Sequence, residues 1–380
     1  MSSNKSDIKR NAWMLKGSLA KKGYDWWWHS FTGINSETQE EKAFFFEAFT
    51  VNPKRNKGEC VLGQDPKTKE QGLLPSYLMI KCGAWGHDAV QLHKFYGFKD
   101  VNINYNVPFK VETKDHTCMV AENESYGQVV ITPEEATAHP EWMCGSGSME
   151  WHVKMKKEIA FNVGYGASKL FRDLALFEMF WHAEGIKTLY EGYVMLNGVK
   201  YDIIPESSYG YQDKNWGHDF TSPWVWLSSN HLISNITGQE LKHSAFEIGG
   251  GAPKVAFIRL KRKLLGNFIY EGDDIEFNFS KFWTGSKTIF NCFETKDKIV
   301  WHVEQTTHSH KLITDITCLK DDMLLVNYEN PLGLKKHNHL FNGGNGEGNL
   351  KLYKKVKGEW QLIDDIHALN IGCEYGEYNL

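Results

Sequence analysis

The stretch LYEGYVMLNGVKYDII, residues 189–204, decides the fold class. Two runs of strand-forming residues lie on either side of Asn197-Gly198. An Asn-Gly pair between such runs is the strongest short-range signal for a two-residue β-hairpin. The stretch at residues 268–283 repeats this pattern around Glu271–Asp274, and residues 299–319 and 349–366 are further strand-like runs. Short strands at regular spacing are typical of antiparallel barrels and sandwiches, so we predict an all-β protein rather than a parallel α/β sheet.

The composition supports this fold class. Of the 380 residues, 14% are aromatic, with 14 Trp, 16 Tyr and 22 Phe. Aromatic and β-branched residues favour pleated sheets. The 34 glycines against 10 prolines fit many turns with few breaks inside strands. A chain of this length can bury a large core without disulfides, in one large domain or two of ordinary size.

Charge and cysteine usage exclude several classes of protein. The formal net charge is −4 and the densest basic stretch is the short RLKRK at residues 259–263, so no nucleic-acid partner is expected. The seven cysteines form no C-x-x-C motif, which argues against zinc-ribbon and thioredoxin-type sites. No apolar run is long enough to span a membrane, and the N-terminus has no apolar signal segment. Free thiols without a secretion signal predict a cytoplasmic location.

Two β domains are predicted, at residues 1–165 and 166–380. The step Trp28-His29 is echoed by Trp181-His182, and the separation of the two steps along the chain suits a domain period. Few helices are expected. They are a leading helix within residues 5–21, a short one that Thr132 caps before Pro133, and one that begins at Ser168.

Residues 209–226, YGYQDKNWGHDFTSPWVW, carry the candidate chemistry. Asp213 lies here among tryptophans and tyrosines, which a solvated loop would not require. A closed sheet of about eight to ten strands encloses a cavity lined by alternate side chains. In a cavity paved with aromatic rings, burial would raise the pKa of Asp213 and keep it protonated as a general acid. The alternative is a turn aspartate that hydrogen-bonds nearby backbone, and the residues alone leave both open.

The histidines point more weakly to chemistry. His182 and His29 each follow a tryptophan on an apolar strand, where a histidine is more often a core residue than a catalyst. Two histidine pairs have two-residue spacing, His308 with His310 and His337 with His339. This spacing would place both members of a pair on one side of a strand. Neither pair has an obvious carboxylate or thiol nearby, so no metal is expected.

Two glycine-rich stretches have a structural interpretation. They lie at residues 249–251 and 341–349, and neither precedes a helix. A dinucleotide fingerprint requires a strand-turn-helix context. We predict bulges and tight turns at both places.

The segment YQDKNWGHDFTSPWVW, residues 211–226, resembles the signature of the tocopherol cyclase family. Further similar pieces follow the same order as in that family: PSYLMIKCGAWG at 75–86, LHKFYGFKDV at 92–101, MFWHAEG at 179–185 and FEIGGG at 246–251. The resemblance covers most of the chain. It implies a two-domain β protein with lipocalin-like halves, and a reaction that closes a chromanol ring on a prenylated hydroquinone.

The resemblance also implies acid-promoted cyclisation without a metal or redox cofactor. A proton goes to the alkene of the tail, a tertiary cation develops, and the phenol oxygen captures it. Asp213 matches the glutamate of the family motif and is the expected acid, and Tyr211, on the same side of a strand, would hydrogen-bond the acid or the substrate. His182 is the expected proton relay. Substrate contacts are expected from Trp28, His29, Trp181, Asn215, Trp216, Trp224 and Trp226.

Other functions stay open at this point. Aspartate in place of glutamate shortens the acid by one methylene. The expected partner is a small apolar aromatic or isoprenoid substrate, with which peripheral membrane association is compatible. A more distant likeness to lipocalin-like carotenoid hydratases leaves hydration of an isoprenoid alkene as an alternative. A carrier that binds an apolar ligand unchanged is the non-catalytic alternative, although a carrier has no need for a buried ionisable group.

Overall fold

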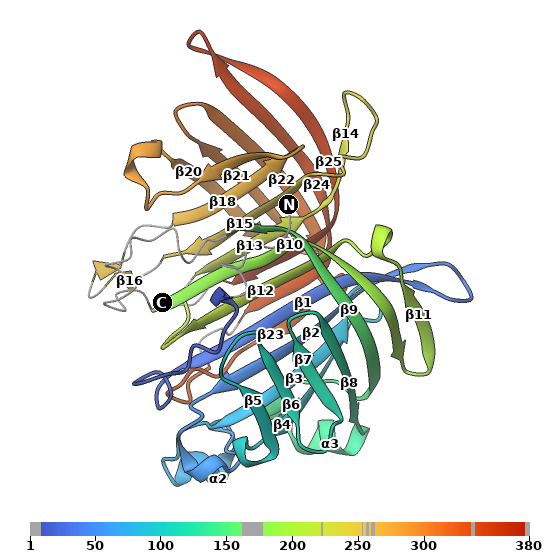
Figure 1. The fold of residues 1–380 in the computed structure, drawn as a ribbon, viewed down its shortest axis with the longest axis vertical. Helices are drawn as coiled ribbons and strands as arrows, with labels where there is room; N and C mark the ends of the chain where they lie inside the picture. Colours follow the sequence, from blue (N-terminus) through green and yellow to red (C-terminus); the bar gives the residue numbers. More distant parts are fainter. Residues whose placement is uncertain are drawn as a thin grey trace.

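The fold is built almost entirely from antiparallel strands in two large sheets (Figure 1). The computed structural model describes residues 9–161, 178–221, 223–252, 254–255, 258–259, 263–335 and 339–376. One sheet closes into a barrel and the other is a half-barrel. The predicted all-β fold, with antiparallel β domains and a few short helices, is confirmed.

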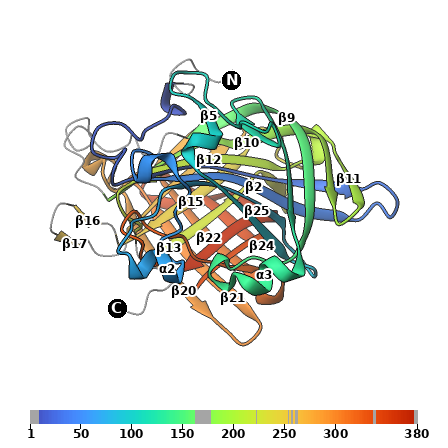
Figure 2. The ribbon, with the colours of Figure 1, turned by 90° about the horizontal axis from the view of Figure 1, so that it is seen from below.

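The first sheet curls back on itself. Its strands are β1 (Tyr24–Asn35), β2 (Glu41–Val51), β3 (Tyr77–Ala84), β4 (Val90–Tyr96), β5 (Val101–Asn104), β6 (Lys110–Thr113), β7 (Cys118–Ala121), β8 (Glu124–Ile131), β9 (Gly147–Phe161), β10 (Met179–Leu196), β11 (Val199–Ile203) and β12 (Gly210–Gly217). Their order is β4-β3-β2-β1-β11-β10-β9-β8-β7-β6-β5, and β12 pairs with both β1 and β10. Because β4 contacts β8 and β9, this sheet is rolled up, and its strands are strongly curved in Figure 2. The Asn197-Gly198 hairpin joins β10 to β11 as predicted.

The second sheet contains the C-terminal half of the chain. Its strands are β13 (Trp224–Ser229), β14 (His231–Ser234), β15 (Ala245–Gly251), β18 (Lys263–Tyr270), β19 (Asp273–Phe277), β20 (Lys287–Glu294), β21 (Lys298–Thr306), β22 (His310–Leu319), β23 (Leu324–Val326), β24 (Leu340–Val356) and β25 (Glu359–Gly376). The order is β19-β18-β15-β13-β25-β24-β22-β21-β20, with β14 on β25 and β23 on β24. The second predicted hairpin is the pair β18–β19. The strand-like runs at residues 299–319 and 349–366 form the pairs β21–β22 and β24–β25. A separate ribbon pairs β16 (Lys254–Val255) with β17 (Ile258–Arg259).

The described helices are short. They are α2 (Pro66–Glu70), α3 (Pro133–Ala138) and the 3₁₀ turns η1 (Asn56–Gly58), η2 (Phe98–Asp100), η3 (Pro140–Trp142), η5 (Pro205–Ser207), η6 (Phe282–Thr284) and η7 (Lys320–Asp322). Thr132 caps α3 as predicted, in a capping box with Glu135. None of the helices in the described ranges is long and apolar enough to cross a membrane. The helix expected at Ser168 lies outside the described residues.

The predicted leading helix is wrong for residues 11–21, which form turns and irregular backbone. Trp13 and Leu15, two positions apart, are both buried in the core of the first sheet. Side chains two positions apart point away from each other on a helix but to the same side of an extended chain. Burial of both is thus incompatible with a helix here.

The chain passes from the first sheet to the second between Gly217 and Trp224. The expected domain boundary near residue 165 lies outside the described residues. On either side of it, β9 and β10 pair with each other over most of their length. Residues 179–217 consequently belong, by hydrogen bonding, with the N-terminal strands.

Buried side chains form three clusters, and the third lies between the sheets. Along β1, Trp27 and Phe31 belong to the core of the first sheet, whereas Tyr24 and Trp28 belong to the third cluster. The second sheet contributes Trp224 to that third cluster, and has a core of its own. We call the region of the third cluster the junction. Strand alternation thus sends one face of the first sheet inward and the other to the junction.

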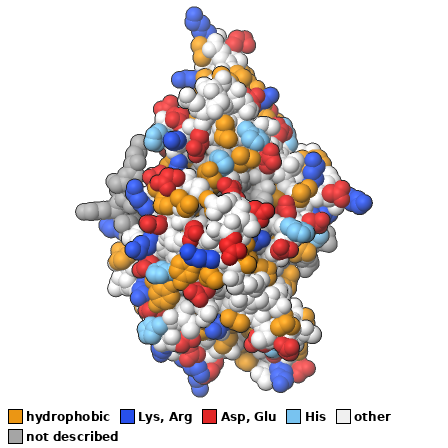
Figure 3. Space-filling view, turned by 90° about the vertical axis from the view of Figure 1, so that its right-hand side faces the viewer, with side chains coloured by type: hydrophobic (Ala, Val, Ile, Leu, Met, Phe, Trp, Pro, Cys, Tyr) orange, Lys and Arg blue, Asp and Glu red, His pale blue; other side chains and the backbone are white. Residues whose placement is uncertain are grey.

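The surface alone does not indicate a site. On the face drawn in Figure 3, acidic, basic and apolar side chains are interspersed without a broad area of one kind. Perturbed ionisable groups cluster at functional sites, so the buried ionisable side chains are the place to look.

Candidate active site

Asp213 lies in the middle of β12, on the face that packs at the junction. It is 8% exposed, and Tyr211 and Asn215 lie on its side of the strand because alternate residues point the same way. Trp181 Nε1 donates to Asp213 Oδ2 at 2.6 Å, and the Tyr211 hydroxyl lies 3.0 Å from the same oxygen. Three side chains that the sequence singled out are thus in direct contact.

Glu247 of β15 reaches the same tyrosine from the second sheet. Tyr211 Oη lies 2.5 Å from Glu247 Oε1, and Trp226 Nε1 donates to this oxygen at 3.1 Å. A tyrosine hydroxyl has one proton and cannot donate to two carboxyl groups. Both contacts of Tyr211 are hydrogen bonds only if one of the two carboxyl groups is itself protonated. The geometry thus calls for a neutral acid in the chain Asp213–Tyr211–Glu247.

Burial sets the protonation of these carboxyl groups. It raises the pKa of Asp213 from 3.8 to about 8, against the smaller opposing effect of the hydrogen bonds from Trp181 and Tyr211. Burial also raises the pKa of Glu247 well above its ordinary value. Asp213 Oδ1 is buried and has no hydrogen-bond partner among the described residues. When Tyr211 donates to Asp213 Oδ2, Glu247 is the protonated group that donates to Tyr211. A proton on Asp213 then lies on Oδ1, where nothing in the described part of the chain holds it.

A third carboxyl group, that of Glu374 on β25, is held in the same way. Trp224 Nε1 donates to Glu374 Oε2 at 2.6 Å, and Asn342 Nδ2 donates to Oε1 at 2.7 Å. Trp85 Nε1 donates in turn to Asn342 Oδ1 at 2.9 Å. Burial raises the pKa of Glu374. The tryptophans at the junction therefore have a specific task, since three of them donate an indole N–H to a carboxyl group.

Glycines of the second sheet make room for tryptophans of the first. A Cβ at Gly249 would lie 2.5 Å from the Trp181 ring, and one at Gly344 would lie 2.3 Å from the Trp85 ring. The bulge predicted at residues 249–251 is wrong, because β15 pairs with β13 there in unbroken register. The glycines are needed for the tryptophan rings. At residues 341–349 the bulge prediction is confirmed by register shifts within β24.

A row of side chains crosses the first sheet on its junction face. Cross-strand pairing joins five of them in the order Asp213, Trp28, Glu47, Lys81 and His93, on β12, β1, β2, β3 and β4. Directly opposed residues of antiparallel strands lie on the same face. The Trp28 indole N–H is buried and has no acceptor among the described residues. It is the donor next to Asp213 that a ligand oxygen could use.

Lys81 and Glu47 form a buried pair that Tyr328 bridges from the second half of the chain. Lys81 Nζ donates to the Tyr328 hydroxyl at 3.1 Å, and this hydroxyl donates to Glu47 Oε2 at 2.9 Å. The direct distance between Lys81 Nζ and Glu47 Oε2 is 3.9 Å. Burial raises the pKa of Glu47 to about 7 and lowers that of Lys81.

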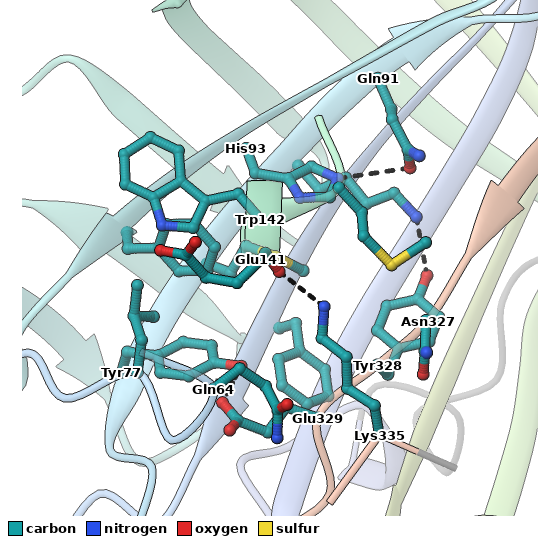
Figure 4. Close-up of a pocket in the computed structure, with 16 residues that line it drawn as sticks. Gln64, Tyr77, Gln91, His93, Glu141, Trp142, Asn327, Tyr328, Glu329 and Lys335 are labelled. Atoms are coloured by element: carbon teal, nitrogen blue, oxygen red, sulfur yellow. Dashed lines mark hydrogen bonds between the residues drawn. The ribbon is translucent and has the colours of Figure 1, made fainter. Parts of the chain in front are cut away.

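A small pocket that is partly open to solvent lies at the Lys81 end of the row (Figure 4). Strands β2, β3 and β4, the loop that contains Trp142 and the segment 327–335 surround it. Its lining residues are Phe49, Leu62, Gln64, Tyr77, Met79, Lys81, Gln91, His93, Phe95, Glu141, Trp142, Met143, Asn327, Tyr328, Glu329 and Lys335.

His182, His29 and Trp216 lie on the opposite, barrel-facing side of the first sheet. His182 follows Trp181 directly on β10 and so points the other way. Burial, with Lys157 nearby, lowers the pKa of His182 to about 3. His29 Nδ1 lies 3.0 Å from the Tyr190 hydroxyl.

The expected relay from His182 to Asp213 does not match this geometry. The sheet itself separates the two side chains. The groups within reach of Asp213 are those of Tyr211 and, through it, Glu247. Of the expected substrate contacts, His29 and Trp216 are likewise on the barrel side, whereas Trp28, Trp181, Asn215, Trp224 and Trp226 are at the junction.

The paired histidines lie elsewhere. His308 is in the turn before β22 rather than on a strand, and His310 is the first residue of β22. His339 Nε2 lies 2.9 Å from Glu294 Oε2 in an exposed ion pair, and His337 lies outside the described residues. Within the described ranges, no three His, Cys, Asp or Glu side chains are grouped so that they could hold a metal ion.

Sequence analysis missed five residues of the junction, namely Glu47, Lys81, Glu247, Tyr328 and Glu374. A signal existed for the first two. Each is a lone charge within an apolar run, FFFEAF at 44–49 and LMIKCG at 78–83. A charge in a strand that is buried on both faces requires a partner or a ligand.

Comparison with known proteins gives only distant similarities. No protein-family model matches the chain, and no curated protein matches it. A crystal structure from Nitrosomonas europaea, described as a candidate AttH, is similar with 10% identity and a TM-score of 0.45 over 96% of each chain. Kievitone hydratase from Nectria haematococca is similar with 10% identity and a TM-score of 0.48, over 100% of this chain and 96% of the other. These similarities concern the overall fold alone.

Proposed function

We propose that this protein is an enzyme that protonates an alkene of an apolar prenylated phenol and closes an oxygen heterocycle of chromanol type, without a cofactor. The observation that carries the proposal is the environment of Asp213. Its Oδ2 accepts from Trp181 and Tyr211, while its Oδ1 is buried without a partner in the described part of the chain. This is the arrangement of a neutral acid that is ready to give up its proton.

The first step moves the proton of Asp213 Oδ1 to one alkene carbon. The other alkene carbon becomes a tertiary cation, and Asp213 becomes a carboxylate. The hydrogen bonds on Oδ2 stabilise this charge without rearrangement, because they are present beforehand. The aromatic rings of Trp28, Trp181 and Trp226 surround the site, and their π faces favour a cation.

The second step is capture of the cation by the phenol oxygen, which forms the C–O bond and releases the phenol proton. This proton restores the acid, so that no atom is gained or lost overall. Glu247 and Tyr211 provide a route for that return, because one hydroxyl links both carboxyl groups. The chemistry thus requires only a recycled proton and a site without bulk water.

Turnover in D₂O tests this proposal. Prenylated hydroquinones, phenolic enones and acyclic carotenoids serve as substrates, and products are followed by mass and ultraviolet absorbance. We expect a product that is an isomer of its substrate, with one non-exchangeable deuterium at the former alkene carbon in place of the phenol hydrogen. The deuterium is expected because the acid proton exchanges with solvent before each turnover.

Other outcomes assign other functions. A product with one deuterium and one added water would show that water, rather than the phenol oxygen, captures the cation, which makes the protein a hydratase. A product without carbon-bound deuterium would contradict alkene protonation. Tight binding of these compounds with no product would favour the carrier.

A further inference from the structure

The pocket at the Lys81 end of the row has aromatic walls. Phe49, Tyr77, Phe95, Trp142 and Tyr328 all line it. Tyr77 meets Phe95 edge to face with ring centroids 5.2 Å apart, and Phe95 lies 5.5 Å from Trp142. In Figure 4 the labelled Tyr77, Trp142 and Tyr328 surround the open space. Walls of this kind accept a flat aromatic ring.

Lys81 supplies this pocket with a buried cation whose ion-pair partner, Glu47, is too far away for a direct hydrogen bond. Its side chain is 1% exposed. Of its three N–H groups, one donates to the neutral hydroxyl of Tyr328, and Glu47 at 3.9 Å is beyond hydrogen-bond distance. The rings of Trp28, Phe45 and Tyr328 lie 5.5, 5.5 and 4.8 Å from Nζ. Burial of an ammonium group among aromatic rings costs free energy unless an anion hydrogen-bonds to it.

We propose that this pocket is a binding site for an aromatic ring with an anionic oxygen, a phenolate or a carboxylate, which contacts Lys81 Nζ. The ring fills the space between the aromatic walls, and the oxygen accepts the N–H groups that Tyr328 leaves unused. This site stands independently of the acid assigned to Asp213.

The acidic side chains near the pocket permit this charge. Glu329 Oε2 accepts from the Gly63 amide and the Tyr77 hydroxyl at 3.1 and 3.2 Å, and burial raises the pKa of Glu329 to about 7. Burial raises the pKa of Glu47 to the same region. Both carboxyl groups can thus be neutral near pH 7. Lys335 also lines the pocket, and its Nζ donates to the Glu141 carbonyl at 2.6 Å.

The test is a binding titration of the full chain with para-nitrophenol, whose phenolate is visible by absorbance. At a pH about one unit below the probe's own pKa, we expect added protein to increase the phenolate absorbance, because Lys81 favours the anion. Para-nitrobenzoate serves as a competitor. If para-nitrobenzoate displaces the probe, the site also binds carboxylates. If it does not, the site binds phenolates but not carboxylates.

Two variants locate the contact. Lys81→Met should weaken binding of the probe by about tenfold or more, as expected for a lost hydrogen bond to a charged group. Lys335→Met is the matched control, because this lysine lines the same pocket with its Nζ bound to a carbonyl, and its effect should stay within about threefold. If Lys81→Met folds poorly because Glu47 loses its counterion, the double variant Lys81→Met/Glu47→Gln, which removes both charges, is used in its place.

The proposal is overturned by three results. These are no phenolate signal with the native protein, unchanged binding in a folded Lys81 variant, and equal loss in the Lys335 control. Probe binding needs no turnover. If an Asp213 variant keeps its activity, the proposed function is contradicted and the Lys81 site is not affected. If the protein converts substrate but binds no probe, the Lys81 site is contradicted and the proposed function is not affected.

Discussion

We expect the Asp213→Asn variant to lose turnover by about 10²- to 10⁴-fold, while its affinity for the substrate stays within a few-fold. Asparagine has nearly the same shape, and its oxygen can still accept from Trp181 and Tyr211. What it lacks is the acidic proton. A loss in kcat with little change in KM would be the signature of a group that acts in the transition state.

Asp364→Asn is the matched control for this variant. Asp364 is also buried, at 3% exposure, and also accepts from a tyrosine, since the Tyr270 hydroxyl donates to its Oδ2 at 3.0 Å. It lies on β25 of the second sheet and also accepts from Ser234 at 2.7 Å. Its replacement should leave kcat unchanged. Full turnover in the Asp213 variant, or equal losses in both, would contradict the role given to Asp213.

The second large effect concerns stability, and we expect Lys214→Met to lower the free energy of unfolding by about 3–5 kcal/mol. Lys214 and Asp25 form an ion pair whose side chains are both 0% exposed, on the barrel-facing side of the first sheet. Lys214 Nζ also lies 3.5 Å from the centroid of the Trp27 ring. Methionine keeps most of the volume but leaves Asp25 without its counterion, and an unpaired buried charge is the costly state.

Equilibrium unfolding in denaturant measures this loss. Lys99→Met is the control, because Lys99 pairs with Glu59 at 2.8 Å while the two side chains are 54% and 60% exposed, and such surface pairs contribute little to stability. The double variant Lys214→Met/Asp25→Asn should regain much of the lost stability, since it removes both charges. A single variant as stable as the native protein would mean that the buried pair contributes nothing.

Most of the fold could be predicted from local patterns. The Asn197-Gly198 turn and the pattern around Glu271–Asp274 specify hairpins within a few positions of the chain, and both formed. The prediction of a helix in the leading segment is wrong because Trp13 and Leu15 pack into a core that strands distant in the sequence form. β9 and β10 are successive strands whose pairing spans residue 165, and no local pattern near that position states that both belong to one sheet.

The site was predictable only in part. The crowding of aromatic and acidic residues around Asp213 led to Tyr211 and Trp181, which do contact it. Alternation along β10 could have shown that His182 points away from Trp181. Glu247 and Glu374 come from strands of the other sheet, and no local pattern states which residues of two packed sheets face each other.

The most direct test of the central claim is an infrared titration of the Asp213 carboxyl group. The carbonyl band of a protonated acid that is present in the native protein and absent from Asp213→Asn belongs to this side chain. Because burial raises the pKa of Asp213, the account predicts that this band is present at neutral pH and fades as the pH rises through about 8. A carboxylate band at neutral pH, with the acid form appearing only near the ordinary value of 3.8, would show that Asp213 is ionised where the enzyme works and cannot be its acid.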